Sequence, residues 1–113
     1  MEESRQESWS EYLDKEMKNK LFVRFVFDPN FKEVEEFAVI YLMIIDNKPC
    51  EVIRYDCNKN EAVNVHYFYH KNPEKRYLDK EKSFSTLEEF IEDIKKNWRN
   101  YQIKYFEKKD IFI

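Results

Sequence analysis

The sequence predicts an α+β fold, a four-stranded antiparallel meander sheet with a long C-terminal helix packed on one face and a short N-terminal helix. Segments rich in β-branched and aromatic residues alternate with short polar turns, which favours hairpins between consecutive strands. An apolar stripe with spacings of three and four residues follows the last strand, as in an amphipathic helix. The chain has 113 residues, 42% of them hydrophobic, so we expect residues 1–113 to form a single domain with one core.

The segment 8–17 carries apolar residues at helical spacing with charged residues between them, which predicts the short N-terminal helix. We expect residues 1–7 and 107–113 to be flexible or interface tails, because the final Ile-Phe-Ile is apolar after a charged run. The large side chains that we expect in the core rather than in a binding site are Trp9, Tyr12, Met43 and Trp98.

Four strands are expected, over residues 20–28, 36–46, 50–56 and 61–70. The second is apolar on both of its alternating faces, which is typical of the centre of a sheet or of an interface. Asn47 can adopt a positive φ in the turn that follows. Pro73 closes the fourth strand, and a charged loop follows to residue 82.

The C-terminal helix is the element with the longest pattern. Ser85 and Glu88 have the spacing of a capping box, which predicts its start. The apolar stripe that follows is Leu87, Phe90, Ile91, Ile94, Trp98 and Tyr101.

The turn at residues 58–60 joins two strands in which polar residues fall at even positions. If Asp56 pairs near Ala62, Arg54 lies opposite Asn64, and all even-numbered residues of the hairpin share one face. That face would carry Val52, Arg54, Asp56, Asn64, His66, Phe68 and His70, while Ile53 and the valines and tyrosines between them pack under the helix.

This grouping has the parts of a phosphodiester-cleaving site, because histidine exchanges protons near neutral pH and arginine can hold phosphate. The candidate catalytic residues are His66, Arg54 and Asp56, with His70 as a further candidate. Asn64 and Phe68 are candidate substrate-binding residues. In the alternative interpretation the face is only solvated, and its charged pairs each contribute about 0.2–1 kcal/mol.

Several classes of function are disfavoured. The chain has no glycine, which excludes phosphate-binding loops of the GxGxxG or Walker type, and no cofactor is expected. No metal site is expected either, because Cys50 and Cys57 are spaced more widely than a CxxC pair and a strand separates His66 from His70 by about 13 Å. The net charge of −3 argues against general nucleic-acid binding.

Two thiols are too few for a disulfide framework, which favours a reducing compartment. There is no apolar run of membrane-spanning length and no basic-then-apolar leader. We therefore expect a cytoplasmic protein that does not contact a membrane.

The run Glu51-Val52-Ile53-Arg54-Tyr55-Asp56, the histidine-bearing strand after it and the closing helix segment Ile94-Lys95-Lys96-Asn97-Trp98 resemble a group of small uncharacterised prokaryotic domains. These domains are similar to the TumE-type toxins of toxin–antitoxin operons, and the resemblance covers about residues 20–103. It implies a small α+β fold and a ribonuclease-like toxin role, with RNA and a cognate antitoxin as partners. Carried over, it points to Arg54, Asp56 and His66.

The chain departs from that pattern where related sequences often carry a histidine and a glycine, since Asn58, Lys59 and Asn60 stand there. Two hypotheses follow. The first is an RNA-directed, toxin-like enzyme that uses the three candidate catalytic residues. The second is a non-catalytic interaction module, a homodimer in which the doubly apolar strand and the C-terminal tail bury against a copy of the chain or another protein.

Overall fold

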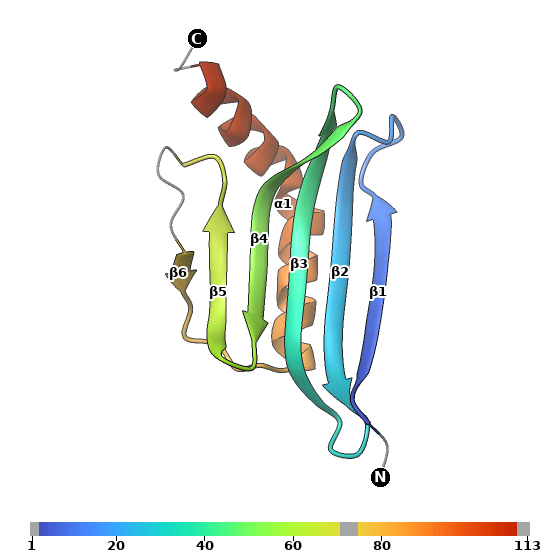
Figure 1. Ribbon diagram of the computed structural model, residues 1–113. Coiled ribbons are helices and arrows are strands. Elements are labelled where there is room, and N and C mark those ends of the chain that lie inside the picture. Colours follow the sequence, from blue (N-terminus) through green and yellow to red (C-terminus); the bar gives the residue numbers. More distant parts are fainter. Residues whose placement is uncertain (1–2, 71–74, 111–113) are drawn as a thin grey trace.

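The computed structural model describes residues 3–70 and 75–110, and within them it confirms an α+β fold with one antiparallel sheet and a long C-terminal helix (Figure 1). The sheet has six strands rather than four, and their order in space is their order in the sequence. The elements are β1 (Arg5–Tyr12), β2 (Asn19–Asp28), β3 (Glu33–Ile45), β4 (Lys48–Asn58), β5 (Glu61–Tyr67), β6 (Lys75–Tyr77) and α1 (Phe84–Asp110).

The predicted N-terminal helix is wrong, because its segment forms the edge strand β1. β1 pairs with β2 in an unbroken antiparallel register from Arg5 opposite Phe27 to Tyr12 opposite Lys20. Backbone pairing along β2 satisfies the amide groups of this polar segment, and it outweighs a helical spacing carried by only a few apolar residues. Trp9 and Tyr12 are 39% and 47% exposed, so their expected place in the core is also wrong.

β6 was not predicted either, since its residues fall in the segment expected to be a charged loop. It is three residues long and pairs with β5, with Val65 opposite Arg76. Three polar residues carry no periodic signal, so only the neighbouring strand defines this element. Pro73, which was expected to close the preceding strand, lies outside the described residues.

The core lies between α1 and the face of the sheet formed by β2, β3 and β4. Met43 and Trp98 are 2% and 7% exposed, which confirms their expected burial. β3 is the central strand that its sequence predicted: Ala38 and Ile40, which point away from the helix, are also only 2% and 5% exposed. The fully buried side chains on the helix side of the sheet include Leu21, Val23, Phe37, Val39, Tyr41 and Ile53.

α1 begins two residues earlier than the predicted capping box. Ser83 Oγ accepts a hydrogen bond from the backbone N of Thr86 at 3.1 Å, and Ser83 O accepts one from Leu87 N at 3.0 Å. Ser83 is therefore the N-cap, and Ser85 lies within the first helical turn. The apolar stripe itself faces the sheet as expected, with Ile94 fully buried.

The hairpins close without glycine. Positive φ angles occur at Met17 (58°), Lys32 (54°), Asp46 (52°) and Asn47 (63°), each outside a strand. Asp46 and Asn47 form the two-residue connection between β3 and β4, where Ile45 pairs with Lys48, and both have the positive φ of a type I′ turn. The prediction for Asn47 is confirmed.

Candidate functional site

The β4–β5 hairpin places the predicted polar residues on one face of the sheet. Arg54 lies directly opposite His66 and Asp56 opposite Asn64. The shared face was predicted, but the expected pairing of Arg54 with Asn64 is wrong by two residues. An irregularity between Asp56 and Asn58 pairs Asn58 with Glu61 and shortens the turn. The pairing partners change as a result, but Arg54, Asp56, Asn64 and His66 stay on the predicted common face.

We call the face of the sheet opposite α1 the open face. Figure 1 looks onto it, with α1 behind the sheet. The residues that lie on it in the cross-strand registers of β2 to β5 include Lys20, Phe22, Arg24, Val26, Glu36, Ala38, Ile40, Leu42, Glu51, Arg54, Asp56, Asn64 and His66.

The guanidinium of Arg54 is held between two carboxylates. Its Nε donates to Glu51 Oε1 at 2.9 Å, and its Nη2 donates to the same oxygen. Its Nη1 lies 3.6 Å from Asp56 Oδ2. Two negative groups therefore surround one positive group, and a phosphate that approached Arg54 would have to compete with both.

Asp56 contributes a buried, uncommitted acceptor to this cluster within the described residues. Its Oδ2 faces Arg54, whereas its Oδ1 is buried and accepts no hydrogen bond from the described residues. Buried polar atoms are usually paired, so this oxygen is the point of the cluster most ready to accept a further donor.

Asn64, a candidate substrate-binding residue, is only 1% exposed. Its Nδ2 donates to the backbone oxygens of Asp56 at 3.1 Å and Ala62 at 3.0 Å, and to Glu61 Oε1 at 3.2 Å. These bonds hold the irregular end of the hairpin together. The amide nitrogen of Asn64 therefore has a structural role in the hairpin and does not form a surface for a ligand.

His66 and Phe68 are neighbours, with ring centroids 4.8 Å apart, and both are partly buried. His70 does not join them. The strand expected to reach residue 70 ends at Tyr67, and the ring of His70 lies 5.2 Å from Tyr67 and 5.0 Å from Tyr69. The structure thus brings together Arg54, Asp56, His66 and Phe68, and places His70 among the tyrosines.

A second polar cluster, which the sequence analysis missed, lies under α1. Asp93 Oδ2 accepts hydrogen bonds from Tyr55 Oη at 2.8 Å and Tyr101 Oη at 2.6 Å, and its Oδ1 accepts one from Asn97 Nδ2 at 2.8 Å. Burial, and then the hydrogen bond to Asp93, raise the pKa of both tyrosines above the ordinary value. They therefore remain protonated donors at neutral pH and join the helix to β4. The signal was present in the sequence, since Asp93 follows Phe90 by three residues and so falls on the apolar stripe.

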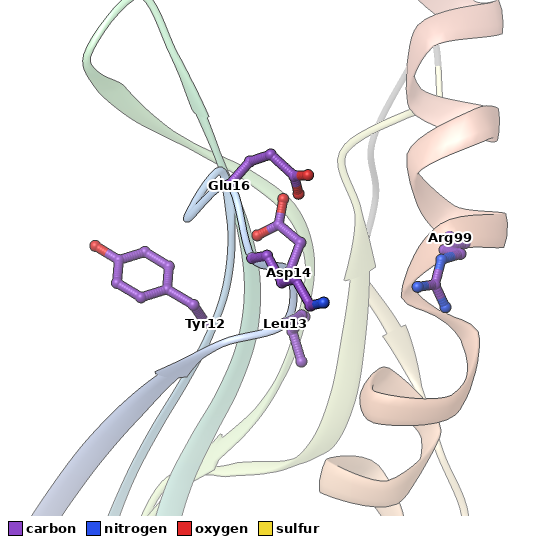
Figure 2. Close-up of a pocket in the computed structure, with 6 residues that line it drawn as sticks. Tyr12, Leu13, Asp14, Glu16 and Arg99 are labelled. Carbon is purple, nitrogen blue, oxygen red and sulfur yellow. The ribbon is translucent and has the colours of Figure 1, made fainter.

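A pocket of about 580 Å³ lies between the β1–β2 loop and α1 (Figure 2). Figure 2 shows Asp14 and Glu16 on the loop and Arg99 on the helix. The full lining is Tyr12, Leu13, Asp14, Lys15, Glu16 and Arg99.

The hydrogen bonds of Asp14 hold the β1–β2 loop in shape and are not directed at a ligand. Its Oδ1 accepts the backbone N–H groups of Lys18 and Asn19, each at 3.0 Å, and its Oδ2 accepts Asn19 Nδ2 at 2.8 Å. Burial opposes ionisation, but the hydrogen bonds from Asn19 and Lys18 outweigh it and lower the pKa of Asp14. The carboxylate is therefore a charged cap for the turn.

Within residues 3–70 and 75–110, no three His, Cys, Asp or Glu side chains come together as metal ligands would. In the same part of the chain no helix has the length and apolar character that a membrane crossing requires. Cys50 and Cys57 are both free thiols, and Cys57 is buried.

A family model described as a domain of unknown function, DUF7718, matches residues 1–111. The chain belongs to the DUF7718 family. The match runs from before β1 to the end of α1, so the DUF7718 domain includes both the open face and the Asp93 cluster. No curated protein and no solved structure matches the chain. The similarity to TumE-type toxins stays a prediction.

Proposed function

We propose that the protein is a non-catalytic protein-interaction module whose docking surface is the open face. One observation carries the proposal: no element of the described chain covers this face, yet its centre is apolar. The accessible apolar surface there comes from Phe22 and Leu42, which are partly exposed, whereas Ala38 and Ile40 beside them are only 2% and 5% exposed. The solvated face of an antiparallel sheet usually carries polar residues, so the partly exposed Phe22 and Leu42 favour a partner at this face.

The charges around this apolar centre also support docking to a protein. They are arranged as pairs on the sheet surface, with Arg24 3.4 Å from Glu36 and Lys75 2.7 Å from Glu61, besides the Arg54 cluster. Paired charges give the face no excess of positive potential that would attract RNA. An apolar centre inside a rim of polar groups is the usual anatomy of a protein interface.

The partner that fits this face is another protein with an apolar patch of its own and polar groups around it. A cytoplasmic location is part of the proposal, because the two free thiols suit a reducing compartment. The apolar tail expected to take part, residues 111–113, lies outside the described residues.

A photo-crosslinking amino acid at two positions tests this proposal in the cells that make the protein. Position 42 lies on the open face, and position 103 is a matched control because Ile103 is 53% exposed on α1. We expect a discrete adduct from position 42 that is absent from position 103. Adding Phe22→Glu, with folding verified by thermal denaturation, should abolish that adduct. Equal labelling at both positions, or no labelling at position 42, would contradict the proposal.

A second candidate function is the ribonuclease-like toxin, with a cognate antitoxin as partner. The observation that favours it is the direct opposition of Arg54 and His66, with the Phe68 ring beside the imidazole. In this proposal His66 acts as general acid or base, Arg54 steadies the phosphate, and Asp56 orients one of them. Phe68 would stack on a base of the RNA.

RNA cleavage and growth arrest decide between the two functions. If the toxin proposal holds, His66→Ala and Arg54→Ala each lower the cleavage rate by about 100-fold or more, and His70→Ala, outside the cluster, leaves it unchanged. If the chain is an interaction module, the wild type and all three variants fail to cleave RNA above a buffer blank. Cleavage that is equal in the wild type and the variants would remove His66 and Arg54 from any catalytic role.

A further inference from the structure

β1 forms a long outer edge of the sheet. It is the first strand in the spatial order, and all eight of its residues are exposed. Its ladder with β2 has no bulge, and its sequence, RQESWSEY, contains neither proline nor lysine. Bulges, proline and charged side chains usually protect an edge from pairing with another chain, and of these β1 has the charges of Arg5, Glu7 and Glu11 alone.

The opposite edge of the sheet is different. β6 has three residues, Lys75–Tyr77, two of which are basic. A short, charged edge strand is a poor template for strand addition. Of the two edges, β1 is therefore the one suited to a partner strand.

The symmetry of a dimer restricts how β1 can pair with a second copy of itself. Two antiparallel copies are related by a two-fold axis perpendicular to the sheet, which leaves the same face of both sheets on the same side. Directly opposed residues must point to the same side of the sheet. An odd-numbered residue must therefore lie opposite an odd-numbered residue, and an even-numbered residue opposite an even-numbered residue. The axis then passes through a residue pair and not between two pairs.

Two such registers use the greatest length of β1, and charge separates them. Centred on Trp9, the pairing sets Glu7 against Glu11 of the second copy at two places, which is unfavourable. Centred on Ser8, it sets Arg5 against Glu11 at two places and Glu7 against Trp9. No like charges are then directly opposed.

The contacts of Lys95 on α1 strengthen the second register. Its Nζ lies 3.0 Å from Glu11 Oε1 and 5.9 Å from the centre of the Trp9 ring. Because Glu7 of the second copy would lie opposite Trp9, the same ammonium group would balance its charge. In this register, each charged residue of the second copy therefore lies near a group of opposite charge on the first copy.

We propose that two copies of the chain join through β1 with Ser8 opposite Ser8, so that the sheet continues from one copy into the other. The helices of both copies lie on the same side, and the two open faces form one continuous surface. The β1 edge is a different surface from the open face, and the dimer does not depend on docking at the open face.

Cysteine substitution tests the register, in a Cys50→Ser background that removes the more accessible native thiol. Directly opposed residues have Cβ atoms about 4.5–5.5 Å apart, near the range of a disulfide, so Ser8→Cys should give a covalent dimer under mild oxidation. Ser10→Cys is the matched control, because its two copies would lie about 13 Å apart along the strand and should stay unlinked. Equal linking at both positions, or none at position 8, would overturn the register.

Sedimentation of the wild type and of charge variants tests the dimer itself. We expect a dimer at micromolar concentrations, and Arg5→Glu should raise its dissociation constant at least about tenfold by opposing Glu11 twice. Adding Glu11→Gln, which removes the opposed charge without placing a second cation beside Lys95, should recover part of the affinity, whereas the control Gln6→Glu, which faces Ser10, should change it less. A wild type that stays monomeric at hundreds of micromolar would overturn the proposal. Because Arg5→Glu does not change the open face, the crosslinking experiment at position 42 tests the docking function independently of the dimer.

Discussion

Asn64 is a buried polar residue whose amide nitrogen bridges three acceptors in the β4–β5 hairpin. Replacing it with alanine removes the donor to the part-buried backbone oxygens of Asp56 and Ala62, while Glu61 Oε1 keeps its bond from Lys75. We therefore expect Asn64→Ala to lower the free energy of unfolding by about 1–3 kcal/mol in urea denaturation. Asn60→Ala, in the exposed turn of the same hairpin, should change it by less than about 0.5 kcal/mol. Similar values for the two variants would contradict the structural role of Asn64.

The raised pKa of Tyr69 predicts how the free energy of unfolding changes with pH in the alkaline range. Burial, and then the neighbouring Tyr67 and Asp93, raise the pKa of Tyr69 from 10.0 to about 12. Above pH 10 the unfolded chain loses this proton while the folded chain keeps it, so the free energy of unfolding should fall as the pH rises from 10 towards 12. Urea denaturation at pH 8, 10 and 11 measures the fall, and Tyr69→Phe should make it shallower. A slope that Tyr69→Phe leaves unchanged would assign the effect to other groups.

Part of the candidate site could be predicted from the sequence. Alternation along a strand is a strict geometric rule, so the common face of Arg54, Asp56 and His66 followed from parity. The pairing partner depends on the irregularity after Asp56, and no composition signal marks it. Whether Arg54 pairs with Glu51 depends on side-chain conformation, which the pattern does not contain.

The helix α1 begins two residues before its predicted start. The hydrogen bond from Thr86 N to Ser83 Oγ identifies the true cap, so Ser83→Ala should lower the free energy of unfolding by about 1 kcal/mol. Ser85→Ala serves as the matched control and should cost less than about 0.5 kcal/mol. Chemical denaturation of both variants checks this, and a larger loss for Ser85→Ala would restore the predicted capping box.

β1 explains why an edge strand escapes sequence analysis. Its residues alternate without an apolar face, because all eight of them are exposed. Trp9 and Tyr12 happen to lie three residues apart, which imitates a helix. β2 to β5 were recognised because their buried residues are rich in β-branched and aromatic types, which a polar edge strand lacks.

The whole domain is held by the layer between α1 and the sheet. Phe90 stacks on Tyr55 with ring centroids 3.9 Å apart and meets Phe37 edge-on at 5.9 Å. Phe90→Ala should therefore lower the free energy of unfolding by about 3–5 kcal/mol, a large part of the roughly 5–15 kcal/mol usual for a domain.

Thermal and urea denaturation measure this loss, and one transition seen by both fluorescence and circular dichroism would show that the helix and sheet unfold together. Ile103→Ala, on the exposed side of α1, is the control and should shift the midpoint little. A Phe90→Ala variant as stable as this control would contradict the packing described for the core.

The hairpin corners have a consequence for heat resistance. Met17 and Lys32 hold a left-handed backbone that side chains with a β-carbon disfavour by about 1 kcal/mol or more. Glycine at these two corners would relieve that penalty, partly offset by the greater freedom it gives the unfolded chain. The domain thus has room to tolerate higher temperatures through changes at its periphery alone, with its interior and both of its proposed contact surfaces left as they are.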